Sequence, residues 1–130
     1  MKYLLDANTI IKRLAGHSKL LTRVSQHQAD QFAISTVVAC ELFFGAYKSQ
    51  KVKQNLARVE ALQFTFLDFD KDDAQRAGAV RAELATAGTL IGPYDLLIAG
   101  QALSRNLILI THNTREFSRV SGLQIEDWEA

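Results

Sequence analysis

Leu4-Leu5-Asp6-Ala7-Asn8-Thr9-Ile10, within the opening residues MKYLLDANTI, is the stretch that decides the fold. Residues Lys2–Leu5 predict a short buried strand, and a helix is expected to follow from Asn8 to about Leu14. Asp6 stands between the two elements, directly after the apolar run. Open parallel sheets place their sites at the carboxyl ends of the strands. The stretch therefore predicts an α/β fold with Asp6 at the functional edge of the sheet.

The rest of the chain repeats this alternation of short apolar runs and longer helical stretches. Further strands are expected at 32–34, 64–69, 107–110 and 123–125, and further helices at 17–26, 35–47, 51–62, 70–87 and 92–105. Ser35 and Asp70 are suited to N-caps, Gly88 to a helix stop, and Pro93 to a first helical turn. No linker, repeat or low-complexity segment interrupts residues 1–130. We therefore expect a single α/β domain with a central, mainly parallel sheet.

Composition excludes several classes of protein. The net charge of +1 argues against a strongly basic nucleic-acid-binding protein, although a local basic patch remains compatible with it. Cys40 is the only cysteine, so neither a disulfide framework nor a zinc-binding cysteine set is expected. No apolar run approaches the roughly 18 residues of a membrane span or forms a signal-peptide core. These features predict a soluble cytoplasmic protein without a membrane partner.

Three carboxylates stand where a charge is costly. Asp6 follows Tyr-Leu-Leu, Glu41 is the only charge between Thr36 and Tyr47, and Asp95 lies inside LIGPYDLLIAG. A buried charge without a partner is so unfavourable that it neutralises or finds one. Three such acids on separate segments therefore indicate one site where they converge on a divalent cation such as Mg²⁺. Metal-assisted phosphoryl chemistry is the first hypothesis.

Each acid also has a simpler explanation. Asp6 suits the N-cap of the first helix, and Asp95 suits a position near a helix N-terminus, where the dipole favours a negative charge. Glu41 lies past a capping position, so its alternative is a partner arginine.

Other polar residues are explained more simply still. Cys40 is expected to be a small buried side chain, and His112 a solvated loop residue that is able to touch RNA. The acids at positions 68, 70, 72 and 73 are expected to cap a helix and stabilise its dipole.

Four blocks in one order resemble PIN-domain nucleases, and most closely the VapC-type toxins of bacterial toxin–antitoxin pairs. The blocks are LLDANT at 4–9, CEL at 40–42, GPYDLLIA at 92–99 and THNTREF at 111–117. The resemblance extends over essentially the whole chain and implies a PIN-like three-layer α/β/α fold. It also implies an endoribonuclease that depends on Mg²⁺, or alternatively Mn²⁺, and cleaves RNA by in-line attack of water. The products would carry 3′-hydroxyl and 5′-phosphate ends.

The resemblance also implies roles for individual residues. Asp6 and Asp95 match the family's metal-binding acids, and Glu41 matches the acid that binds metal or orients the attacking water. Asn113 stands where many relatives have a fourth aspartate, so it would contribute an oxygen directly or through water, without the charge. Asn8, Thr9 and Thr111 are assigned hydrogen bonds that support the acids, with ordinary capping or strand-end roles as the alternative.

Partners are implied by the same resemblance. The expected substrate is structured RNA, with transfer RNA cut near its anticodon as the best guess. Arg115, Lys12, Arg13 and Lys48 are candidate phosphate contacts, with Arg115 the first choice because it is close to Asn113. For any single lysine, a solvated helix face is the better explanation. A homodimer held inactive by a VapB-type antitoxin is expected, and Phe43, Phe44 and Tyr47 form either its apolar surface or part of the core.

Two other functions remain open at this stage. An aspartate after the first strand also occurs in aspartyl-phosphate phosphotransfer enzymes and receivers, but Asn8 stands where such a phosphatase would carry a second acid. The other alternative is a PIN-like module retained only for binding, against which all three acids argue.

Overall fold

A computed structural model describes all residues from Met1 to Ala130. Its centre is a five-stranded sheet with the strand order β3-β2-β1-β4-β5. All four strand pairings are parallel, so the predicted α/β class and parallel sheet are confirmed. The strands are β1 (Tyr3–Leu5), β2 (Phe32–Ser35), β3 (Thr65–Leu67), β4 (Ile108–Ile110) and β5 (Ile125–Glu126).

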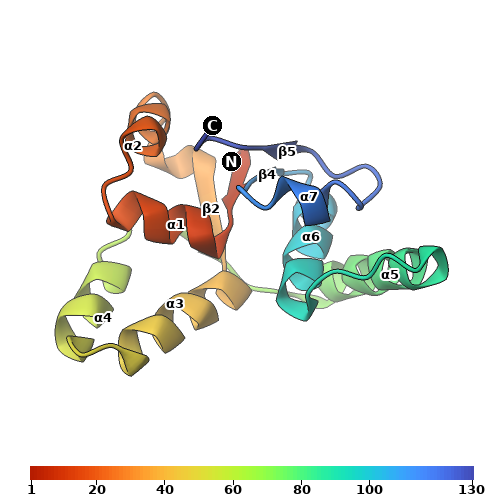
Figure 1. The fold of residues 1–130 in the computed structure, drawn as a ribbon, viewed down its shortest axis with the longest axis horizontal. Coiled ribbons are helices and arrows are strands. Elements are labelled where there is room, and N and C mark those ends of the chain that lie inside the picture. Colours follow the sequence, from red (N-terminus) through yellow and green to blue (C-terminus); the bar gives the residue numbers. More distant parts are fainter.

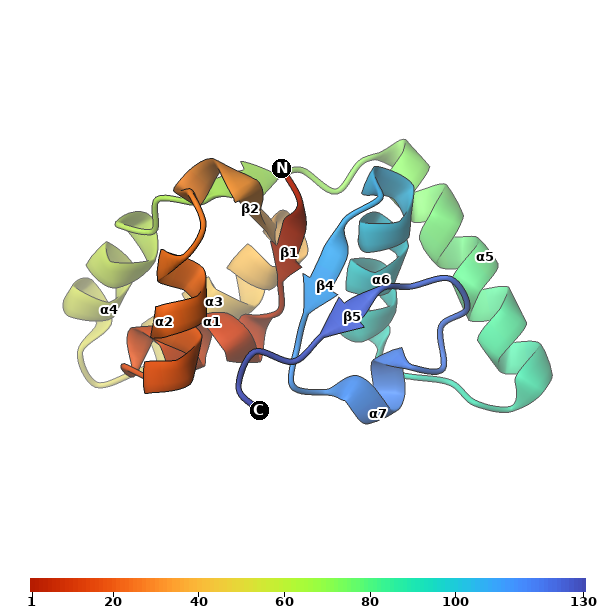
Figure 2. The same cartoon turned by 90° about the horizontal axis from the view of Figure 1, so that it is seen from above.

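Helices flank this sheet on both sides. In Figures 1 and 2, the first four helices lie to one side of β1, and the last three lie to the other side. They are α1 (Ala7–Leu14), α2 (Ser18–Ser25), α3 (Thr36–Lys48), α4 (Val52–Glu60), α5 (Lys71–Ala87), α6 (Pro93–Arg105) and α7 (Thr114–Phe117), with a 3₁₀ turn at Ala29–Gln31. None of them is both long and apolar enough to cross a membrane.

Local sequence signals account for most helix ends. Ser35 caps α3 by accepting a hydrogen bond from the Val37 amide at 3.1 Å. Asp70 and Asp73 form a reciprocal capping box at the start of α5, which ends at Gly88 with a positive φ of 71°. Pro93 occupies the first turn of α6. These termini agree with the sequence prediction because each one depends on the chemistry of adjacent residues.

Elements that depend on distant partners were predicted less well. The strand expected at 64–69 is only Thr65–Leu67, because its sole neighbour is the four-residue strand β2. The last strand was expected at 123–125 and lies at Ile125–Glu126, where it pairs with β4. Helix α7 was not predicted at all. Its single turn follows a loop in which the backbone amide of Asn113 donates to Thr111 Oγ1 at 3.0 Å.

The close approach of α5 and α6 requires a glycine. A Cβ atom added at Gly100 would lie 2.6 Å from the Cα of Ala77 and 2.7 Å from its backbone nitrogen. Those are backbone atoms of α5, so they cannot move aside as the tip of a side chain would. Any larger residue would force the two helices apart, which would shift the start of α6 where Asp95 lies.

The outer face of α3 corrects one prediction. Cys40 is exposed rather than buried, and Phe44 and Tyr47 are each 65% exposed. Positions 40, 44 and 47 share one face of a helix because they are four and then three residues apart. The opposite face, which includes Val38 and Leu42, packs into the core. The helix is apolar nearly all round, so composition alone did not show which face would be buried.

Candidate active site

Asp6 lies at the carboxyl edge of the sheet, between β1 and α1. Its side chain has two roles at once. Oδ1 accepts the Ala7 amide at 2.8 Å and caps α1, while Oδ2 accepts the Thr111 hydroxyl at 2.9 Å. The residue is only 5% exposed. Burial raises the pKa of Asp6, the two hydrogen bonds partly oppose this, and the charge of Glu129 raises it further. Each oxygen keeps a second lone pair, so the capping role does not prevent the carboxylate from binding a cation.

Two helices bring the other two acids to the same place. Glu41 lies in the second turn of α3, and Asp95 lies in the first turn of α6. Burial and the charge of Asp6 raise the pKa of Glu41. Burial, the charge of Asp6, hydrogen bonding and charge at Glu116, and the charge of Glu41 raise the pKa of Asp95 to about 7. The structure therefore brings these acids close enough to repel one another.

Glu116 is a fourth acid at the site that the sequence analysis did not single out. It lies on α7, and its Oε2 accepts a hydrogen bond from the Asn113 side-chain amide at 2.7 Å. This bond lowers the pKa of Glu116 against the effect of burial, and Asp95, Arg119 and Arg115 lower it further. Glu116 sits next to a basic residue in a segment where no helix was expected. The only available signal was therefore its place in the THNTREF block.

The supporting polar residues take different positions. Thr111 is 1% exposed and holds Asp6, as described above. Thr9 is equally buried, but its hydroxyl donates to the Ile110 carbonyl at 3.2 Å and so ties α1 to β4. Asn113 orients Glu116 through its amide nitrogen. Asn8 is exposed on α1.

The predicted RNA-binding cations are not all gathered around the acids. Arg115 lies on α7 close enough to lower the pKa of Glu116. Lys12 is exposed on α1. Arg13 stacks over the ring of Phe64, 5.0 Å from its centre, which places it near the amino end of β3 rather than the edge that carries Asp6. Lys48 lies 5.4 Å from the ring centre of exposed Phe44.

Two connected grooves adjoin the acids. One, of about 410 Å³, is lined by Glu41 and Asp95 together with Ile11, Phe44, Gly92, Pro93 and Tyr94. The other, of about 340 Å³, lies among α1, α3 and α4 and is mostly apolar. Both are lined by Ile11 and Glu41, so a chain bound in the apolar groove would lead directly to the acids.

The donor set fits a hard divalent cation. Asp6, Glu41 and Asp95 take part in none of the ion pairs of the chain, so no Lys or Arg side chain offsets their repulsion. A divalent cation would do so, and Mg²⁺ and Mn²⁺ prefer carboxylate oxygens. Raised pKa values at three converging carboxylates are what such a centre shows before its ion binds.

The raised pKa of Asp95 predicts an unusual pH dependence of stability in chelator. Between the ordinary pKa of about 3.9 and the folded-state value of about 7, the folded chain holds a proton that the unfolded chain has released. The free energy of unfolding should therefore fall as pH rises through this window. Thermal unfolding at pH 5 and pH 8 measures this effect. Asp95→Asn should weaken the dependence, whereas exposed Asp30→Asn should leave it; equal pH dependence in both variants would contradict the prediction.

Comparison with known proteins shows the family to which the chain belongs. Residues 3–123 match the PIN domain family model. The chain is 41% identical over 130 residues to the tRNA(fMet)-specific endonuclease VapC of Salmonella typhimurium, with 98% of each chain covered. It is 37% identical to ribonuclease VapC2 of Haemophilus influenzae, again with 98% of each covered. The crystal structure of DNA-bound VapBC from Salmonella typhimurium matches with a TM-score of 0.94 over 98% of each chain, at 41% identity. The resemblance read from the four sequence blocks is thus confirmed, and the chain belongs to the PIN-domain family, in which its relatives are VapC ribonucleases.

Proposed function

We propose that this chain is the toxin of a toxin–antitoxin pair and a metal-dependent endoribonuclease. The observation that carries the proposal is the convergence of Asp6, Glu41 and Asp95 at one edge of the sheet, where the charge of Asp6 raises the pKa of the other two and that of Glu41 raises the pKa of Asp95. Acids in such an arrangement would repel an RNA phosphate unless a cation lay between them. The relatives named ribonuclease VapC supply the reaction class.

The side chains divide the chemistry among them. Asp6, Glu41 and Asp95 would hold Mg²⁺ or Mn²⁺, which when bound neutralises phosphate charge and lowers the pKa of water. Thr111 fixes the direction of the Asp6 carboxylate through its hydroxyl. Glu41 would orient the attacking water and accept its proton. No serine or cysteine nucleophile is needed, and Cys40 lies on the outer face of α3.

The substrate we propose is transfer RNA, cut in its anticodon region. A relative that is 41% identical over nearly its whole length carries the name tRNA(fMet)-specific endonuclease. Arg115 is the cation best placed to contact a phosphate beside the scissile bond. Because the substrate is cytoplasmic and the only cysteine is free, we place the activity in the cytoplasm.

Two surfaces suit protein partners. The apolar groove among α1, α3 and α4 would hold a segment of a VapB-type antitoxin, whose continuation would cover Glu41 and block the acids. VapBC complexes among the solved relatives support such a partner.

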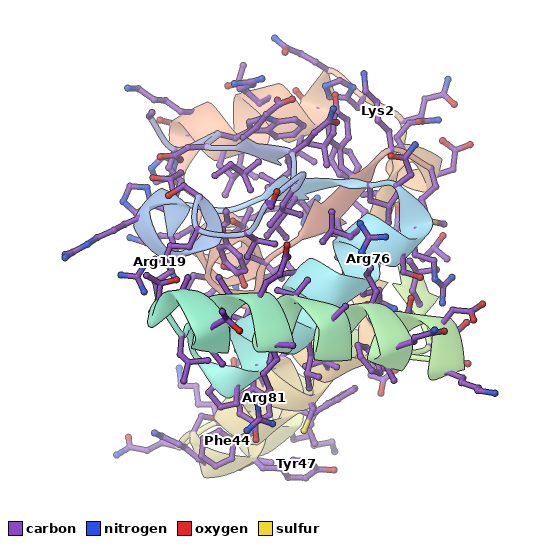
Figure 3. The ribbon with its side chains drawn as sticks, turned by 90° about the vertical axis from the view of Figure 1, so that its right-hand side faces the viewer. Lys2, Phe44, Tyr47, Arg76, Arg81 and Arg119 are labelled. Atoms are coloured by element: carbon purple, nitrogen blue, oxygen red, sulfur yellow. The ribbon has the colours of Figure 1, made fainter.

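Phe44 and Tyr47 extend from α3 on the side toward which Arg81 points from α5 (Figure 3). Large exposed aromatic residues favour an interface, and we assign this face to a homodimer.

Ile11→Asp should weaken antitoxin binding at least about tenfold, because it puts a charge where both grooves meet. Ile11 is 51% exposed, so the fold should tolerate the change. Titration calorimetry with a purified VapB-type antitoxin measures the effect. Leu21→Asp, at a 38% exposed position of α2, is the matched control and should bind normally. Equal affinity of the two variants would place the antitoxin elsewhere.

Cleavage of purified transfer RNA by antitoxin-free protein tests the function itself. Reactions with Mg²⁺, with Mn²⁺ and with chelator, followed by sequencing of new 5′ ends, should show discrete cuts only with metal. Intact RNA under all conditions, from folded protein, would favour the binding-module alternative. Phosphorylation of Asp6 would instead favour phosphotransfer, although the exposed Asn8 provides no second acid for it.

A further inference from the structure

A second group of metal-binding side chains lies beside Asp6 but shares none of the acids of the proposed centre. His112, in the loop after β4, and Asp127 and Glu129, near the end of the sequence, each offer one ligand atom. These three atoms all lie within 4.8 Å of one another. In a tetrahedral zinc site, ligand atoms lie roughly 3.3 Å apart, given metal–ligand distances of about 2.0–2.1 Å. Small side-chain rotations would therefore let one ion touch all three.

The last residues are held firmly in the position that creates this group. Trp128 is 1% exposed and packs edge-on against Tyr3 and flat against His27. Its indole nitrogen also donates to Glu126 Oε1 at 2.9 Å. Figures 1 and 2 show the chain leaving β5 and crossing toward α2, where Ala130 lines a pocket with Ser18 and Arg23. Asp127 and Glu129, on either side of the anchored Trp128, are thereby brought to the loop that carries His112.

The hydrogen bonds bring two of the ligand atoms together and leave the third without a partner. Asp127 Oδ1 accepts the Glu129 amide at 2.9 Å, which directs Oδ2 toward His112 Nδ1 at 3.0 Å. Glu129 Oε2 is buried and has no hydrogen-bond partner. A buried carboxylate oxygen without a donor is costly and calls for a cation or a donor. Arg23, which stacks over the ring of Trp128, pairs with Glu126 instead.

We propose that His112, Asp127 and Glu129 form a separate site for a first-row transition-metal ion, such as Zn²⁺ or Mn²⁺. Imidazole nitrogen combined with two carboxylates favours such ions over Mg²⁺, which prefers oxygen ligands. A bound ion would be the positively charged partner that the Glu129 oxygen lacks. It would also join the last residues of the sequence to the loop that carries Thr111, the hydroxyl donor to Asp6. The site would therefore restrict the motion of the loop beside the proposed active centre, although it shares no ligand with Asp6, Glu41 and Asp95.

The test uses Zn²⁺ alone as the probe and does not depend on nuclease activity. In the full-length Asp6→Asn/Asp95→Asn chain, whose carboxylate centre is disabled, calorimetry should still find one Zn²⁺ per chain. Adding His112→Ala or Asp127→Asn should weaken that binding by at least about 100-fold, because each removes a ligand. Asp30→Asn, at an exposed position, is the matched control and should bind normally.

A second measurement reports on the ligand directly. Zn²⁺ should shift the imidazole resonances of His112 and leave those of His17 and His27 in place. His112 is exposed, so its alanine variant should fold, which a thermal melt in chelator verifies. Absence of stoichiometric Zn²⁺ binding, or binding unaffected by both ligand substitutions, would overturn the proposal.

Discussion

Asp95→Asn is expected to lower the rate of RNA cleavage by about three orders of magnitude at saturating Mg²⁺. A bound metal contributes several kcal/mol to stabilising charge in the transition state, and each 1.4 kcal/mol or so changes the rate tenfold. The asparagine side chain keeps the shape and one oxygen of Asp95. It removes the negative charge that, with Glu41 and Asp6, would bind the metal ion. Single-turnover cleavage of a transfer RNA by antitoxin-free protein measures the loss.

The same variant should not be less stable than the parent chain. Burial, together with repulsion by the charges of Asp6, Glu116 and Glu41, raises the pKa of Asp95 to about 7. Removing its charge relieves that repulsion, so in chelator at pH 8 the variant should melt at the same temperature or higher. Lost cleavage together with retained stability is the signature of a residue kept for function.

Asp30→Asn is the control for this experiment. Asp30 is exposed on the 3₁₀ turn before β2, far along the strands from the carboxyl edge, so its variant should cleave RNA normally. Full activity in Asp95→Asn would remove Asp95 from the proposed centre. Equal loss in both variants would point to a general effect of charge rather than to the site.

Arg105→Met is expected to destabilise the folded chain by roughly 2–3 kcal/mol, below the cost of breaking a fully buried ion pair, because the Arg105 side chain is 31% exposed although Asp73 is buried. Asp73 is fully buried, and its carboxylate accepts hydrogen bonds from Arg105 Nε and Nη2, both at 3.1 Å. Gln101 donates a further bond at 3.1 Å. Methionine fills the space of the arginine stem but leaves the Asp73 charge without its cation. Thermal and urea unfolding at pH 7 measure the change.

The pH dependence of this ion pair gives an independent check. Burial alone would raise the pKa of Asp73, but hydrogen bonds from Arg105 and from the Asp70 amide lower it to about 2. Because the folded-state pKa lies below the unfolded one, the pair stabilises the chain above about pH 4. That contribution disappears as pH falls toward 2. Arg105→Met should weaken this dependence, because only the hydrogen bonds from the Asp70 amide and Ser104 would still lower the pKa of Asp73.

An exposed arginine of α5 supplies the matched control. Arg76→Met makes the same chemical change at a position without an ion pair, and it should shift stability by less than about 0.5 kcal/mol. A similar stability for Arg105→Met and Arg76→Met would show that the buried pair contributes little net stability.

Much of the candidate site was visible in the sequence because its acids interrupt apolar runs. Asp6, Glu41 and Asp95 each stand out from their neighbours, and the structure places all three at one edge. Glu116 did not stand out, because it lies in a polar segment beside Arg115. The buried pair of Asp73 and Arg105 was also missed, since Asp73 resembled one more capping acid in a cluster of four.

The sequence by itself determined the order and type of the main elements and their caps, and it carried the prediction that three charges share a common partner. These properties depend on side chains within a few residues of one another, where hydrogen bonding and hydrophobic periodicity act locally. Only the tertiary structure decided which face of α3 is buried, how α7 brings Glu116 to Asp95, and where the last residues meet His112. Those outcomes depend on contacts between segments distant in the chain, since the packing of whole helices and strands, rather than local preference, determines which side chains meet.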